Sequence, residues 1–159
     1  MYNQTSSPNP NNFIKTTTII HLGLLIGQVL FGTVVFFSAQ NPVVDLHPGN
    51  DVIFYVAPLM IIAAMFVGSL LYKQQIKKSA EKTTVKEKLG VYQAALIMRC
   101  AASEGASFFC IAYTLITANL FYLILAGVNI IYFISIRPTR EKIEEALNLD
   151  YNEKAVIDG

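Results

Sequence analysis

Charged residues are scarce in this chain of 159 residues: 14% are Asp, Glu, Lys or Arg, whereas 53% are hydrophobic. A soluble domain usually carries about a quarter charged residues. The formal net charge is only +1, so the chain has no basic domain that could neutralise nucleic-acid phosphates. This composition excludes an ordinary soluble enzyme and a nucleic-acid-binding module.

Cysteine and histidine are also rare, with two residues of each. Cys100 and Cys110 lie in one apolar stretch, and on a single helix they would be about 15 Å apart, too far for a disulfide. No Cys/His cluster has the spacing of a metal site, and the sequence contains no nucleophile–base pair or phosphate loop. It therefore predicts neither a disulfide scaffold nor an enzyme, and it predicts no metal or cofactor.

The chain does contain long apolar stretches, which cover about residues 13–38, 52–72, 89–116 and 118–136. Each approaches or exceeds the roughly 20 residues with which a helix crosses about 30 Å of hydrocarbon. We therefore expect an all-α membrane protein, with a four-helix transmembrane bundle over residues 13–137. The polar residues 1–12 are predicted to be a disordered tail.

Basic residues are confined to one side of the predicted bundle. Six lysines lie in residues 73–88 and four Lys or Arg residues lie after residue 136, whereas the 40–51 and 117–119 connections contain none. Because Lys and Arg are retained on the cytoplasmic side, both termini are predicted to be cytoplasmic, in a bacterial inner membrane. The lysine-rich 73–88 segment is also predicted to contact anionic lipid headgroups.

The predicted cytoplasmic tail covers residues 138–159. Within it, Ile143, Ala146 and Leu147 form an apolar stripe at helical spacing. This stripe predicts a short amphipathic helix, which either lies on the inner membrane surface or caps the bundle.

The two halves of the apolar region resemble each other. Residues 54–56 (Phe-Tyr-Val) align with residues 121–123 (Phe-Tyr-Leu) at an offset of 67. This likeness allows the four spans to be two tandem helical hairpins. Gly23 and Gly27 form a GxxxG pattern, which indicates close helix packing either inside the chain or in a homo-oligomer.

Several polar residues fall at membrane depth. The bilayer centre, roughly 16–20 Å below the outer helix ends at 1.5 Å per residue, is the expected depth of Gln28, Glu104 and Asn129. The inner boundary, about 27 Å down, is the expected depth of His21 and Arg99. The polar residues of the third span lie mostly on one helical face. The candidate intramembrane polar cluster comprises Glu104, Arg99, Gln28, Asn129, His21, Gln93, Ser103 and Ser107.

This cluster has two interpretations. Buried amides and carboxyls often join helices by hydrogen bonds, which would make the protein a structural or accessory membrane component. Alternatively, Glu104 is a titrating site in a small transporter or ion-coupled subunit, with His21 and Arg99 as its inner relay or counter-charge. Under both interpretations the protein contacts the lipid bilayer, and its expected partner is a second copy or another membrane protein.

Two motifs resemble a known pattern. Residues 92–109 are similar to YQxALIxR…EGxSFF, and residues 137–149 are similar to RPTxEKI…LxL. Together they resemble a family of small four-span inner-membrane proteins of Bacteroidota-type bacteria. The resemblance implies membership and topology but no activity. Its motif residues in this chain are Gln93, Arg99, Glu104, Gly105, Arg137, Pro138 and Lys142.

Overall fold

The structure is a computed structural model that describes residues 10–47 and 49–158, and its regular elements are helices. The elements are α1 (Pro10–Ser38), α2 (Ile53–Lys77), the 3₁₀ turn η1 (Lys78–Glu81), α3 (Val85–Thr117), α4 (Leu120–Ser135), α5 (Arg140–Ala146) and α6 (Tyr151–Asp158). The predicted all-α class is confirmed. The predicted disordered tail lies mostly outside the described residues, although α1 already begins at Pro10 rather than at Phe13.

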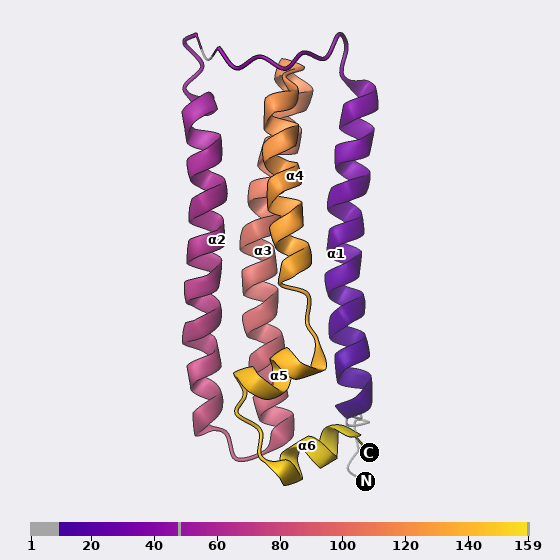
Figure 1. The fold of residues 1–159 in the computed structure, drawn as a ribbon, viewed down its shortest axis with the longest axis vertical. Coiled ribbons are helices and arrows are strands. Elements are labelled where there is room, and N and C mark those ends of the chain that lie inside the picture. Colours follow the sequence, from indigo (N-terminus) through magenta and orange to yellow (C-terminus); the bar gives the residue numbers. More distant parts are fainter. Residues whose placement is uncertain (1–9, 48, 159) are drawn as a thin grey trace, which may run out of the picture.

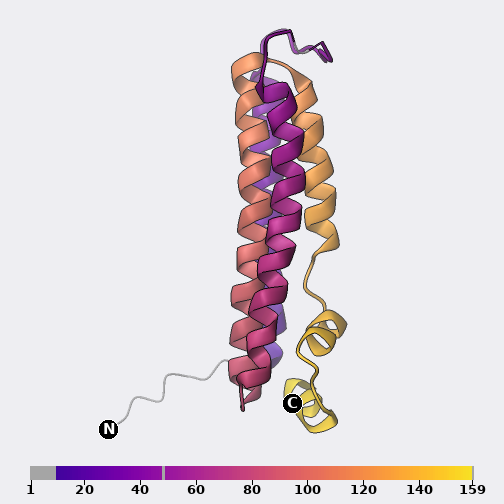
Figure 2. The same ribbon diagram turned by 90° about the vertical axis from the view of Figure 1, so that its left-hand side faces the viewer.

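The four long helices form an elongated bundle with α3 and α4 at its centre (Figures 1 and 2). α3 and α4 are an antiparallel hairpin with a tight turn at Ala118, whose φ of 54° lies in the left-handed region. α1 and α2 flank this hairpin on opposite sides, and the 39–52 connection passes across its end (Figure 1). The first two spans therefore do not pack against each other as a hairpin. This differs from the two tandem hairpins that the sequence likeness of the halves allows.

Three helices, α1, α2 and α3, are long and apolar enough to cross a membrane. α4 has only 16 residues, or about 24 Å, and it supplies a fourth crossing only together with α5, which is bent from it by 75°. The predicted span over 118–136 is thus shorter than expected. Pro138 explains the early end, because it lacks an N–H and disfavours helical geometry at the residue before it.

The outer surface of the bundle is strongly apolar. Large hydrophobic side chains remain exposed along the helices, for example Phe37 at 80%, Leu59 at 65% and Ile131 at 69%. A water-soluble monomer rarely exposes a continuous surface of this kind, whereas lipid favours it because every backbone polar group of a helix is already satisfied internally. Helix length and surface chemistry therefore both indicate a multi-pass membrane protein.

The lysine-rich 73–88 segment is mostly helical. α2 continues to Lys77, and α3 begins at Val85 with Thr84 as its N-cap. The Thr84 hydroxyl accepts the Glu87 N–H at 3.3 Å and the Glu87 carboxylate accepts the Thr84 N–H at 3.3 Å, which is a capping box. With 33 residues, or about 50 Å, α3 is longer than a hydrocarbon core about 30 Å thick. Its first turns, which carry Lys86, Glu87 and Lys88, extend beyond the apolar stretch.

The C-terminal tail packs against these projecting turns. Ile143, Leu147 and Leu149 are buried in one cluster with Leu89 and Tyr92 of α3. An ion pair of 2.5 Å joins Lys88 Nζ to Glu153 Oε1. Figure 1 shows α5 crossing α3 just beyond the end of α4. Because α4 is short, it leaves this part of α3 uncovered, and the tail covers it. Of the two arrangements that the sequence allows for the tail, the structure has the one that caps the bundle.

At the opposite end, the 39–52 connection is bonded to the α3–α4 turn. The Val43 N–H donates to the Ala118 carbonyl at 3.0 Å, and the Leu120 N–H donates to the Val43 carbonyl at 2.8 Å. The Asn119 side chain adds two bonds to the backbone of Asp45, at 3.1 and 2.9 Å. These contacts hold α1 and α2 to the central hairpin although α1 and α2 lie on opposite sides of it.

Asp51, just before α2, links three helices at this end. Its carboxylate accepts the Tyr122 hydroxyl of α4 at 2.5 Å, the Tyr113 hydroxyl of α3 at 3.0 Å and the Ile53 N–H at 2.9 Å. The hydrogen bond from Tyr122 is the main cause that lowers the pKa of Asp51 below its usual 3.8, against the opposing effect of partial burial. The ionised carboxylate thus ties three helices together.

We expect Asp51→Asn to lower the melting temperature at neutral pH, and we expect this difference from the wild type to shrink in acid. Because the folded-state pKa is depressed, the carboxylate stabilises the fold above about pH 3.8 and loses this effect as the pH falls through the folded-state pKa. Thermal unfolding in detergent at a series of pH values down to about 3 measures it. Asp45→Asn is the control, since among the described residues that carboxylate contacts only the nearby His47, through its N–H at 2.8 Å and its Nδ1 at 3.4 Å. An Asp51→Asn deficit that is the same at every pH would contradict the prediction.

Candidate functional site

The centre of the bundle holds a closed hydrogen-bonded group, which we call the Asn129 triad: Asn129 of α4 with Ser103 and Ser107 of α3. The Asn129 Nδ2 donates to the Ser103 carbonyl at 2.6 Å and to the Ser107 Oγ at 2.7 Å, and the Ser103 Oγ donates to the Asn129 Oδ1 at 3.1 Å. All three residues are fully buried. The amide uses both of its N–H donors and its oxygen, so the triad bonds α4 to α3 in the buried interior of the bundle.

Gln28 of α1 has the same depth but no such partner. Its side chain is fully buried, and neither its amide nitrogen nor its amide oxygen has a hydrogen-bond partner in the described part of the chain. The hydroxyl of Thr17, on the same face of α1, is also buried and has no hydrogen-bond partner among the described residues. An unpaired buried amide or hydroxyl is costly in an apolar environment, so these two groups weaken the bundle rather than hold it together.

His21 bonds to the end of the short helix. Its Nε2 lies 3.0 Å from the carbonyl oxygen of Phe133, and its ring stacks on the Phe133 ring at 4.6 Å. A carbonyl can only accept, so Nε2 carries the proton. Phe133 is in the last turn of α4, and its carbonyl also accepts the Ile136 N–H at 3.3 Å. His21 therefore adds a second hydrogen bond at this helix end and joins α1 to α4.

Glu104 lies outside the Asn129 triad. It is partly exposed, and no hydrogen bond or ion pair joins its carboxyl to another described residue. Gln93 is half-buried and lines a small gap between α1 and α3 beside Thr17, His21 and Cys100. The eight candidate residues therefore do not form one cluster around Glu104. They form separate groups, and only the Asn129 triad joins three of them.

Arg99 faces another side of α3, where it contacts tyrosines. Its Nε donates to the Tyr132 hydroxyl at 3.1 Å, and its guanidinium lies over the rings of Tyr72 and Tyr132 at 5.3 and 5.6 Å. The Tyr132 hydroxyl also bonds to Ser69 Oγ of α2 at 3.0 Å. Sequence reasoning about charged and amide groups alone omitted these tyrosines. Their places near the inner ends of the apolar stretches, where Tyr is enriched, are the signal that could have included them.

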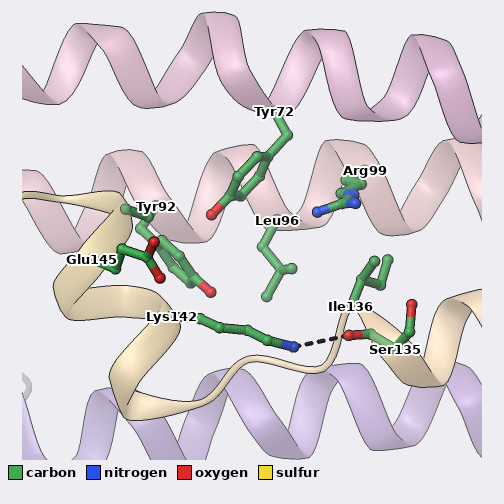
Figure 3. Close-up of a pocket in the computed structure, with 9 residues that line it drawn as sticks. Tyr72, Tyr92, Leu96, Arg99, Ser135, Ile136, Lys142 and Glu145 are labelled. Carbon is green, nitrogen blue, oxygen red and sulfur yellow. Dashed lines mark hydrogen bonds between the residues drawn. The ribbon is translucent and has the colours of Figure 1, made fainter.

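A cavity of about 510 Å³ opens beside Arg99, between α2, α3 and the tail (Figure 3). We call it the inner cavity. It is lined by Tyr72, Tyr92, Leu96, Arg99, Ser135, Ile136, Lys142, Glu145 and Ala146. Lys142 Nζ donates to the carbonyls of Ser135 and Arg137 at 2.8 and 3.1 Å, which caps the C-terminal end of α4. The cavity exists because α4 ends early and the tail returns beside it.

Comparisons with known proteins do not add to this picture. No family model matches the chain, and neither a curated protein nor a solved structure matches it. The resemblance to small four-span inner-membrane proteins stays a prediction. Within residues 10–47 and 49–158, no three His, Cys, Asp or Glu side chains come together to hold a metal ion.

Proposed function

We propose that the chain is a structural or accessory protein of the bacterial inner membrane, with four crossings and both termini in the cytoplasm. The observation that supports this best is the Asn129 triad. Its polar side chains lie at membrane depth and form hydrogen bonds from one helix to another. Such closed bonding is typical of groups that hold a bundle together. A path for ions instead needs polar groups that remain available along the membrane normal.

The orientation rests on the lysines. The start of α1, the lysine-rich 73–88 segment and the tail helices all lie at one end of the bundle (Figure 1). The opposite end carries Asp45 and Asp51 but no Lys or Arg in its connections. This distribution supports a cytoplasmic location for the lysine-bearing end under the positive-inside rule.

An accessory role implies a partner in the membrane. A Cβ built on Gly23 or Gly27 of α1 would meet nothing within 4 Å, so the GxxxG pattern is not used to pack helices inside this chain. This observation favours the other sequence interpretation of the pattern, contact with a second copy of the chain.

A second candidate function is an ion-coupled subunit that uses Glu104, and one observation favours it. Glu104 is a carboxyl at membrane depth that is partly exposed and has no bonding partner among the described residues, and intramembrane carboxyls of this kind often bind protons or ions. The two candidates differ in what the removal of the Glu104 charge would do.

Under our proposal, Glu104→Gln leaves folding and stability nearly unchanged, because the carboxyl makes no bond that the amide would lose. Proteoliposomes with the wild-type chain should then show no more pH-driven flux than protein-free vesicles, and the variant should behave identically. The measurement is a pH-sensitive dye inside the vesicles, with recovery of folded protein as the control. Wild-type flux that Glu104→Gln abolishes would overturn the structural proposal in favour of the ion-coupled one.

A further inference from the structure

The inner cavity lies at the depth of the inner lipid headgroups. Arg99 is 18 residues below the outer end of α3 at Thr117, or about 27 Å, and the hydrocarbon core is about 30 Å thick. The cavity is open to the surroundings on the side of Lys142 and Glu145, which are both exposed. It is therefore within reach of a lipid whose acyl chains lie along the apolar surface of the bundle.

Hydrogen-bond donors point into this cavity. The guanidinium of Arg99 is directed between Tyr72 and Leu96, and the hydroxyls of Tyr72 and Tyr92 point toward the same space (Figure 3). Only the Nε of Arg99 is used by Tyr132, and a guanidinium has five N–H donors in all. The rings of Tyr72 and Tyr132, over which the guanidinium lies, hold it in place. The Tyr92 hydroxyl donates to the Tyr72 hydroxyl, so the other guanidinium N–H groups and the Tyr72 O–H are the donors oriented before any ligand arrives.

The charge of the cavity matches one particular kind of anion. Its charged lining residues are Arg99, Lys142 and Glu145, which sum to +1. A phosphodiester carries a single negative charge, whereas inorganic phosphate near neutral pH carries between one and two. Guanidinium groups bind phosphate oxygens with two parallel hydrogen bonds. Charge, donor geometry and depth therefore agree on a phosphodiester at the membrane interface.

We propose that the inner cavity binds the phosphate of an inner-leaflet glycerophospholipid through the Arg99 guanidinium and the Tyr72 hydroxyl, which the Tyr92 hydroxyl holds in place. This site is distinct from the lysine-rich 73–88 segment, whose lysines other than Lys88 are exposed. It binds one lipid in a formed cavity, and the bound headgroup bridges α2 and α3 beside the docked tail.

The test is native mass spectrometry of the purified full-length chain in detergent, titrated with phosphatidylglycerol, phosphatidylethanolamine or diacylglycerol. Both phospholipids are expected to bind with a stoichiometry of one, and diacylglycerol, which lacks the phosphate, is expected to bind at least tenfold more weakly. Excess inorganic phosphate is expected to leave the lipid bound. Displacement by inorganic phosphate would overturn the lipid assignment, and equal binding of diacylglycerol would overturn the phosphate assignment.

Variants locate the site. Arg99→Gln is expected to weaken phospholipid binding about tenfold or more, since hydrogen bonds to a charged group are among the strongest in proteins. Arg99→Lys, which keeps the charge without the planar fork, should be intermediate. Tyr72→Phe keeps the ring and removes only a hydroxyl, so it should fold normally and still weaken binding a few-fold. Lys82→Gln, an exposed lysine outside the cavity, is the control. If it weakens binding as much as Arg99→Gln, or if Arg99→Gln and Tyr72→Phe both bind like the wild type, the cavity is not the site.

Discussion

Asn129→Leu is expected to destabilise the bundle by about 2 kcal/mol, because it removes the three hydrogen bonds of the Asn129 triad. Interhelical hydrogen bonds in membrane proteins are worth about 0.6 kcal/mol each on average, and the change also leaves the buried Ser103 and Ser107 hydroxyls without their partner. Leucine has the same branched arrangement of side-chain heavy atoms as asparagine but is larger, so overpacking adds to this loss. Reversible unfolding in mixed micelles measures the difference.

Gln28→Leu is the matched control, since it also converts a fully buried amide to an aliphatic side chain. The Gln28 amide has no partner among the described residues, so the change removes a cost and breaks no bond. We expect its stability to be unchanged or higher by up to about 1 kcal/mol. Equal destabilisation by both variants would show that the bonding of the Asn129 triad is not what distinguishes the two sites.

Ile143→Ala should release the C-terminal tail from the bundle. Ile143 is fully buried in the cluster that joins α5 to α3, and truncating a buried isoleucine to alanine costs about 2–5 kcal/mol. The tail is a short segment with few other anchors, chiefly Leu147, Leu149 and the Lys88–Glu153 pair. A loss of this size therefore shifts the docking equilibrium at least tenfold toward the open form.

Hydrogen exchange of the α5 and α6 amides, and tryptic cleavage after Lys142 and Lys154, measure this release. Both should accelerate at least tenfold in the Ile143→Ala variant while the α1–α4 amides stay protected. Ile134→Ala is the matched control, because Ile134 is 51% exposed on the outer surface and loses little packing. Unchanged cleavage of the Ile143→Ala tail would mean that the docked tail does not depend on this cluster.

The helices themselves were largely predictable from the sequence. The apolar stretches are long enough to identify the elements, and the hydrophobic composition excludes a soluble domain. Local signals also predict where helices end: Pro138 follows the end of α4, and the Thr84-x-x-Glu87 pattern begins α3. The predicted span boundaries differ from the helix ends chiefly where α2 and α3 continue into the lysine-rich segment, because hydropathy marks the membrane and not the helix.

The partners of the polar residues were not predictable in the same way. Helical periodicity assigns Glu104, Ser103 and Ser107 to neighbouring positions on α3, but it does not say which of them faces α4. The packing of α4 against α3 brings Asn129 to the two serines and leaves Glu104 at the edge of the interface. The charge of Glu104 therefore does not indicate which polar residue joins the helices, which in the structure is Asn129.

The sequence alone determined that the chain forms apolar helices suited to a lipid bilayer and that its basic residues lie at one end. These properties depend on composition and short-range order. Only the tertiary structure decided that α1 and α2 are separated by the α3–α4 hairpin, that the tail fills the place left by a short α4, and that Arg99 lies in a cavity among tyrosines. These features depend on contacts between residues far apart in the chain. Such contacts are set by how helix faces pack together, which the periodicity of one helix does not contain.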